Sequence, residues 1–338
     1  MKNKLLITTA IASGMMISSA ALAEVKVSGD VEATHRSVSY DLASEQVDSA
    51  AGLGIETNII IGYKGTLKNG MTVSAGSVLE DGTADSEYLT IGGSAVSFTI
   101  GQDVGNNLSA TVVPHISDQS GTFYSMGSAT TANTFNLITL VANQLGGKPH
   151  EPLHVSLDGK VAGGTATFRY TPSMSSTQSD SGIEDAGNSA IEVLYQGSLG
   201  VSGLNVQIGT ARQTPANDSD ATTDDAVLNK VGASYNFGQV SVGAQTQRYD
   251  SGAATNADTE QNTFAIVFAA SDSFRIGARY EVVDKDGLTA DEKMKTIEIG
   301  YNLGGLGIEL AVGQIENIGG VAANGDADVI QIRTRQAF

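Results

Sequence analysis

Residues 274–282 read FRIGARYEV, and apolar side chains occupy every second position of this stretch. One face carries Phe274 and Tyr280, and the opposite face carries Arg275 and Arg279. A period of two is typical of a β-strand whose two faces meet different surroundings. The same alternation recurs at residues 55–63, 230–237 and 296–302. The sequence therefore predicts an all-β protein built from two-faced strands.

The connections between these stretches alternate in length. Short connections, rich in Gly, Asn, Asp and Ser, stand at residues 68–70, 92–94, 158–160, 200–203, 238, 271–273 and 304–305. Long connections, mostly polar and acidic, stand at residues 40–52, 80–86, 103–152, 173–188, 213–226, 250–260, 284–293 and 317–326. In an up-and-down barrel this alternation places all short turns at one end and all long loops at the other.

Sixteen strands follow from this pattern. They are predicted at residues 25–39, 53–66, 70–80, 86–92, 95–102, 153–160, 162–172, 189–199, 203–212, 227–237, 239–249, 261–271, 273–283, 294–303, 306–316 and 327–338. An even number leaves both termini at the short-turn end. Residues 134–143 could form a further strand, but we assign them to the third long loop because an odd strand would break this parity.

The first 23 residues are predicted to be a cleaved secretory signal peptide. Lys2 and Lys4 form a basic head, an apolar run follows, and residues 21–23 read ALA, a small-residue cleavage signature. The apolar run is shorter than the ~20 residues needed to span a membrane, which disfavours an anchor. Cleavage would leave residues 24–338 as one barrel domain.

The composition excludes several classes of protein. The 338 residues hold 19 basic and 37 acidic side chains, and without Lys2 and Lys4 the net charge changes from −18 to −20. Nucleic-acid binding needs a basic surface, so it is not expected. The chain has no cysteine, which excludes a disulfide-stapled scaffold. The longest apolar run after the signal, about residues 264–270, is too short for a membrane helix.

The apolar face is predicted to meet lipid and the polar face a water-filled lumen. On the polar face stand Arg36, Arg169, Arg275, Arg279, Arg333 and Arg335, with Glu32, Glu56 and Glu298. A soluble sandwich would need long connections that cross between its sheets, whereas these hairpins simply follow one another. Closure into a barrel leaves no unpaired strand edge in lipid. We therefore predict a transmembrane, antiparallel, up-and-down β-barrel of 16 strands.

No motif predicts catalysis, a metal or a cofactor. Residues 150–154 match the HExxH pattern of zinc metalloproteases, but that chemistry requires a helix, and Pro152 breaks one. In an extended chain, His150 and His154 would lie ~13 Å apart, too far to share a zinc ion. The acidic residues 217–225 lack the ligand spacing of a calcium loop and are interpreted as solvated loop charge. The protein is not expected to be an enzyme.

Three short stretches resemble the general diffusion porins of Gram-negative bacteria. The chain ends in a strand, residues 330–338, whose last residue is Phe338; Thr334 and Gln336 replace the usual apolar residues there. Residues 24–29, EVKVSG, resemble the opening strand of that family. Residues 97–102, SFTIGQ, precede a loop of about fifty residues and are similar to the family's fifth strand.

This resemblance implies several properties. The location would be the outer membrane, and the third loop would fold into the lumen and narrow it. The barrel-assembly machinery would recognise Phe338 as an assembly signal, and three barrels would pack as a homotrimer.

The predicted function is passive diffusion of small hydrophilic solutes and ions. A 16-stranded barrel is wide enough for an aqueous channel, so a sieve needs an obstruction, and residues 103–152 form the longest loop. Asp103, Asp118 and Glu151 on this loop are expected to face the lumen arginines across the constriction. Such opposed charges would orient dipolar solutes.

Two alternatives remain open. The inward arginines would also suit a substrate-selective channel for anions, phosphate or sugars. The long acidic loops would suit a structural or adhesive surface protein, or a bridge to lipopolysaccharide through divalent cations.

Overall fold

The computed structural model describes most of the chain between residues 24 and 338. The described residues are 24–41, 49–102, 108, 111–116, 153–172, 189–214, 225–250, 258–318 and 325–338. The predicted signal peptide and residues 134–143 lie outside these ranges. No helix among the described residues is long and apolar enough to cross a membrane.

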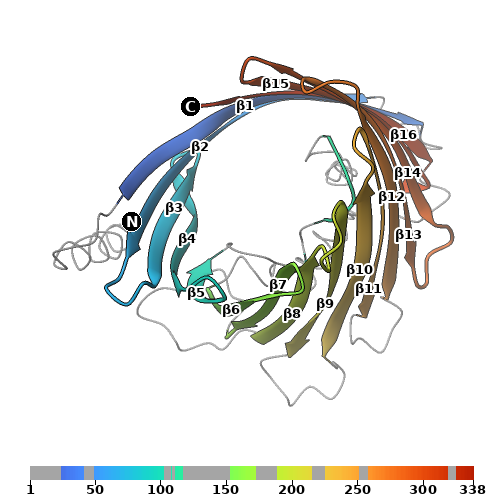
Figure 1. Ribbon diagram of the computed structural model, residues 1–338. Coiled ribbons are helices and arrows are strands. Elements are labelled where there is room, and N and C mark those ends of the chain that lie inside the picture. The colour runs from blue at the N-terminus through green and yellow to red at the C-terminus, as the bar shows by residue number, and fades with distance from the viewer. Residues whose placement is uncertain are drawn as a thin grey trace.

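The described residues form sixteen strands. These are β1 (Glu24–Asp41), β2 (Ser49–Thr66), β3 (Thr72–Glu80), β4 (Thr83–Gly92), β5 (Val96–Gln102), β6 (His154–Val161), β7 (Gly164–Thr171), β8 (Ser189–Gly197), β9 (Leu204–Thr214), β10 (Ala226–Asn236), β11 (Val240–Asp250), β12 (Thr259–Ala269), β13 (Phe274–Lys285), β14 (Glu292–Leu303), β15 (Leu306–Glu316) and β16 (Asp326–Ala337). Each strand pairs with its neighbours in sequence, and β1 pairs with β16 to close the barrel. Figure 1 shows the resulting ring, in which the colour advances from strand to strand around the circle. The predicted all-β barrel of 16 antiparallel strands is thus confirmed.

Two predicted loops are shorter in the structure than in the sequence analysis. Residues 80–86 were expected to form a long loop, yet β3 ends at Glu80 and β4 begins at Thr83. Asp81 and Gly82 alone make the turn, with φ angles of 47° and 80°. An Asp-Gly pair with two positive φ angles is a favoured two-residue hairpin turn, so the acidic stretch pairs as strand. Likewise β2 begins at Ser49, inside the predicted loop at 40–52.

The seam between β1 and β16 is continuous. Its register runs from Asp30 opposite Ala337 to Asp41 opposite Asp326. Gly29 and Phe338 extend the ladder through two backbone hydrogen bonds, with N···O distances of 3.1 and 2.9 Å. Because a lipid bilayer offers no partner to an unpaired backbone group, this seam is what allows the sheet to span it.

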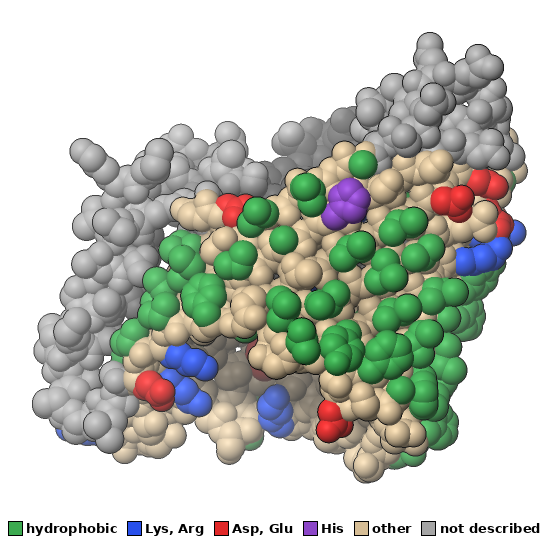
Figure 2. All heavy atoms as spheres, turned by 90° about the horizontal axis from the view of Figure 1, so that it is seen from above, with side chains coloured by type: hydrophobic (Ala, Val, Ile, Leu, Met, Phe, Trp, Pro, Cys, Tyr) green, Lys and Arg blue, Asp and Glu red, His purple; other side chains and the backbone are tan. Residues whose placement is uncertain are grey.

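The two faces of the strands differ as their sequence alternation predicts. Outward positions are large and exposed, as with Ile330 and Ile332 on β16, at 47% and 43% exposure. The inward neighbours Gln331 and Arg333 are 1% and 4% exposed. Figure 2 shows one outer side of the barrel, where hydrophobic side chains spread across the middle and charged ones gather towards the edges. This distribution matches a lipid-facing band.

Deleting Phe338 is expected to weaken the barrel at its seam. The deletion removes both hydrogen bonds to Gly29 and the ring that packs over it, since a Cβ added at Gly29 would lie 2.7 Å from Phe338 Cζ. The folded barrel of the deletion variant runs as a compact band on electrophoresis, and this band should disappear at a lower heating temperature than that of the full chain. Asn69→Ala, in the exposed turn between β2 and β3, is the control and should behave like the wild type. Equal heat resistance of the deletion and the full chain would contradict this role of Phe338.

Candidate functional site: the lumen wall

A cluster of charges covers the inner wall where β15, β16 and β1 meet. Arg333 on β16 is paired with Glu32 on β1 at 3.2 Å and with Glu309 on β15 at 2.6 Å. Arg335 lies one inward position further along β16 and donates to both carboxylate oxygens of Asp30, at 3.0 and 3.1 Å. These arginines are therefore held by carboxylates from the two strands that flank β16.

Arg36 belongs to the same wall. Its Nε donates to Oε1 of Gln331 at 2.7 Å, which bridges β1 and β16. This hydrogen bond fixes the position of the positively charged guanidinium on the lumen wall.

Two further arginines lie beside carboxylates elsewhere on the wall. On β13, Arg279 contacts Glu281 at 2.5 Å, and the same carboxylate accepts from Thr263 at 2.9 Å. Arg169 on β7 is 1% exposed and stands opposite Glu192 of β8 in the strand register. Charge on the wall is thus largely arranged in pairs between adjacent positions.

The predicted site residues divide into two groups. All six arginines lie on the inward face; Arg275, near the short-turn end of β13, is exposed. The three predicted acidic partners, Asp103, Asp118 and Glu151, lie outside the described residues. Of the carboxylates that do contact the arginines, Glu32 was placed on the polar face from the sequence, whereas Asp30, Glu281 and Glu309 were not singled out. Asp30 shares the parity of Glu32 and Arg36 along β1, and that shared parity is the signal that could have identified it.

Part of the long connection between β5 and β6 lies against the inner wall. We name the described part of it, Leu108 and residues 111–116, the inner segment. The Leu108 N–H donates to Glu192 of β8 at 3.1 Å, and its carbonyl accepts from Lys230 of β10 at 2.7 Å. At the other end, the Ile116 N–H donates to Glu298 of β14 at 2.6 Å. The inner segment therefore runs across the wall from β8 to β14.

The inner wall is not polar throughout, which the sequence analysis did not predict. Two buried apolar clusters are built mainly from inward strand positions towards the loop end, with Ile318 after β15 and Leu108 of the inner segment packed among them. The first holds Val38, Val283, Met294, Ala311, Ile315, Ile318, Ala327 and Val329, and the second holds Leu108, Ala190, Leu194, Ala211, Ala226, Leu228 and Tyr249. Adjacent apolar pairs such as Val282-Val283 and Val329-Ile330 break the alternation in the sequence and mark where both faces become apolar.

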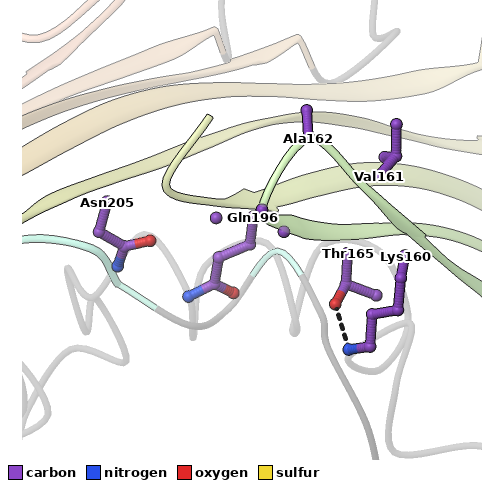
Figure 3. Close-up of a pocket in the computed structure, with 9 residues that line it drawn as sticks. Lys160, Val161, Ala162, Thr165, Gln196 and Asn205 are labelled. Carbon is purple, nitrogen blue, oxygen red and sulfur yellow. Dashed lines mark hydrogen bonds between the residues drawn. The ribbon is translucent and has the colours of Figure 1, made fainter. Parts of the chain in front are cut away.

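An open cavity with a mixed polar and apolar lining lies at the short-turn end of the wall. It measures about 570 Å³ and lies between the turn that joins β6 to β7 and the neighbouring ends of β8 and β9. In Figure 3, Lys160, Thr165, Gln196 and Asn205 extend to one side of the sheet, and Val161 and Ala162 extend to the other. Lys160 Nζ donates to Thr165 Oγ1 at 2.7 Å. The cavity thus presents one cation and several neutral polar groups.

No group of metal-binding side chains stands out in the described part of the chain. His154 begins β6, as expected for a strand residue, and it is fully buried on the inward face. His150 and Glu151 of the HExxH match lie outside the described residues.

Comparisons with known proteins agree with this architecture. No curated protein sequence matches the chain. Among solved structures, the chain is similar to the anion-selective porin from Comamonas acidovorans, with a TM-score of 0.67 and 18% identity, covering 94% of this chain and 100% of that one. A porin refined at 1.8 Å gives a TM-score of 0.63 at 12% identity, covering 92% and 100%. The trimer form of in-vitro folded OmpT from Vibrio cholerae gives 0.58 at 14% identity, covering 94% and 99%.

A family model described as Gram-negative porin matches residues 8–320 of the sequence. The match covers nearly the whole chain, and the closed 16-stranded barrel is the fold of the porin structures compared above. The chain therefore belongs to the family of Gram-negative porins.

Proposed function

We propose that this porin is a weakly ion-selective sieve whose narrowest point lies between the third loop and the charged wall of β15, β16 and β1. As a Gram-negative porin, the protein is a non-enzymatic outer-membrane channel for passive diffusion of small solutes and ions.

The pairing of wall charges supports weak selectivity. Arg333, Arg335 and Arg279 each contact a carboxylate on their own or an adjacent strand. A paired charge produces a short-range field that falls off faster than that of a lone ion. A passing ion therefore meets local fields of both signs rather than a wall of one sign.

The contacts of the inner segment support a constriction formed by the third loop. Leu108 is held by β8 and β10, and Ile116 by β14, so this part of the loop lies inside the ring of strands. The charged wall of β15, β16 and β1 follows β14 in the ring. We propose that Asp103, Asp118 and Glu151 line the loop side of the passage, and that Arg36, Arg333 and Arg335 line the wall side. Arg169 on β7, and Arg275 and Arg279 on β13, would line the lumen beside this passage.

A preference for anions is the second candidate. Arg275 and Lys160 are exposed inward cations near the short-turn end, where they would meet solutes leaving the channel. The similar structure from Comamonas acidovorans is an anion-selective porin. In this alternative the exposed cations, rather than the paired ones, decide the ion preference.

The remaining proposals concern export and assembly. Residues 1–23 would be a cleaved signal peptide, and Phe338 the residue that the barrel-assembly machinery recognises. Three copies would form a homotrimer, in keeping with the trimer form of the similar OmpT structure. The acidic loops would contact lipopolysaccharide through divalent cations.

Removing the third loop is expected to widen the channel. A variant that lacks residues 106–145 should form a folded barrel with a higher single-channel conductance in a planar bilayer, because the obstruction is gone. Folding is checked by the heat-dependent shift in electrophoretic mobility. A folded deletion variant with unchanged conductance would place the constriction elsewhere.

Two arginine variants distinguish a charge that stabilises the barrel from a charge that affects the ion preference. Arg333→Ala leaves Glu32 and Glu309 without their shared cation, and losing one partner of a buried pair costs about 3–5 kcal/mol. We therefore expect its barrel to denature at a lower temperature. Arg275→Ala removes an exposed charge, so it should keep wild-type stability within about 0.5 kcal/mol and shift the reversal potential in a salt gradient towards cations. Identical behaviour of the two variants in both assays would contradict this division.

A further inference from the structure

A row of glycines crosses the inner wall beneath the inner segment. Its members, which we name the glycine row, lie on five strands and are Gly209 on β9, Gly232 on β10, Gly243 on β11, Gly277 on β13 and Gly300 on β14. All five lie on inward positions of their strands. Glycine inside a strand weakens it and often marks a place where another part of the chain approaches closely.

At four of these glycines, the atom nearest to an added Cβ belongs to a side chain of the inner segment; at Gly277 it belongs to Val267 of β12, at 3.1 Å. A Cβ at Gly209 would lie 2.6 Å from Leu108 Cδ2, and one at Gly232 would lie 2.8 Å from Val112 Cγ2. At Gly243 the nearest atom is Pro114 Cδ, at 2.6 Å. Carbon atoms in contact normally lie about 3.5–4.0 Å apart, so the inner segment occupies space that only glycine leaves open.

Ile116 completes the series at the far end. Its Cγ2 would lie 2.6 Å from a Cβ at Gly300, and its Cδ1 would lie 3.3 Å from one at Gly277. The residues that fill the row are Leu108, Val112, Pro114 and Ile116, all at even positions. Val112, Pro114 and Ile116 stand two positions apart, and all three contact the row from the same side of the described stretch at residues 111–116.

On three strands, a polar side chain two positions from the glycine binds the inner segment. On β10, Lys230 precedes Gly232 and donates to the Leu108 carbonyl. On β11, Gln245 follows Gly243 and accepts from Thr111 Oγ1 at 3.3 Å. On β14, Glu298 precedes Gly300 and accepts from the Ile116 N–H.

These polar groups fix the position of the inner segment along the wall, in addition to its distance from the wall. Lys230 and Glu298 are 3% and 1% exposed, so they are committed to the wall rather than to solvent. They satisfy backbone groups of a loop that crosses a sheet whose own ladder is already complete. The glycines set how close the inner segment lies, and the polar neighbours set its register along the wall.

We propose that the glycine row determines how far the third loop projects into the lumen and thereby sets the bore of the channel. Glycine on five of the six strands from β9 to β14 lets the inner segment lie close to the wall, and any side chain at these positions would push it towards the opposite wall. The residues that fix the size cut-off therefore include wall glycines that never touch the solute. This inference rests on the proposed constriction by the third loop.

The position of the inner segment can be tested by disulfide trapping, because the chain has no cysteine of its own. A Cβ at Gly300 would lie 4.0 Å from Ile116 Cβ, within the usual span of about 3.5–4.5 Å for a disulfide. The pair Ile116→Cys with Gly300→Cys should oxidise to a crosslink in the folded barrel. The control pair, Ile116→Cys with Gly54→Cys, places the second thiol on an open inward position of β2 and should not. Folded barrels in which the Gly300 pair fails to crosslink would overturn the proposal.

The effect on the bore can be tested by adding and removing one side chain. Gly300→Ala should lower the single-channel conductance, because among the described residues the atoms near its Cβ belong to Ile116. Adding Ile116→Ala removes the clashing methyl group and should restore the conductance towards the wild-type value. Gly54→Ala, which has open space around its Cβ, should leave conductance unchanged. Equal conductance of Gly300→Ala and Gly54→Ala would overturn the proposal.

Two outcomes distinguish a failure of the channel function from a failure of the glycine row. If the wild-type chain carries no current while the Gly300 pair crosslinks, the channel proposal is wrong and the packing of the inner segment stands. If the wild type conducts normally and the crosslink does not form, the channel stands and the glycine row does not position the loop.

Discussion

The pairing of β1 with β16 is the constraint on which the rest of the structure depends. Every backbone N–H and C=O at membrane depth needs a partner within the protein, and a sheet meets this need only when it closes on itself. The seam joins the first and last strands, from Gly29 and Phe338 to Asp41 and Asp326. Once the sheet is closed, each strand has one face towards lipid and one towards the lumen. The alternation of the sequence follows from that division.

Charged side chains and loop backbone groups buried inside the barrel also need partners. They find them on neighbouring strands of the wall. Arg333 and Arg335 are held by carboxylates from β1 and β15, and Glu192, Lys230 and Glu298 bind the backbone of the inner segment. Charged side chains therefore pair with one another on one part of the wall and bind the loop backbone on the other. Strands between β8 and β14 bind the inner segment, and the strands β15, β16 and β1 carry the paired charges of the wall.

Much of the fold was predictable from the sequence because the period-two pattern and the alternation of short and long connections act on every strand. The strand count, the antiparallel order and the inward side of the arginines followed from these regularities. The turn at Asp81 and Gly82 was missed because its acidic flanks were interpreted as loop, although Asp-Gly is a strong hairpin signal.

The site was less predictable because its contacts join residues far apart in the chain. Parity along one strand shows that Arg333 faces inward, but only the register between strands shows that Glu32 and Glu309 are its partners. Likewise, Gly232 and Gly300 are unremarkable in their own strands, and their relation appears only when the inner segment crosses them. Periodicity predicts which way the side chains of one strand face, but it does not predict which residues of different strands meet in the lumen.

The central claim is that one face of each strand lines a water-filled lumen and the other faces lipid. The most direct measurement is a cysteine scan of β2 in the membrane-inserted protein, with a charged, membrane-impermeant thiol reagent. Cysteines at the inward positions Glu56 and Asn58 should react, and cysteines at the outward positions Thr57 and Ile59 should be protected. Reaction at all four positions, or at none, would contradict a closed barrel with an aqueous interior.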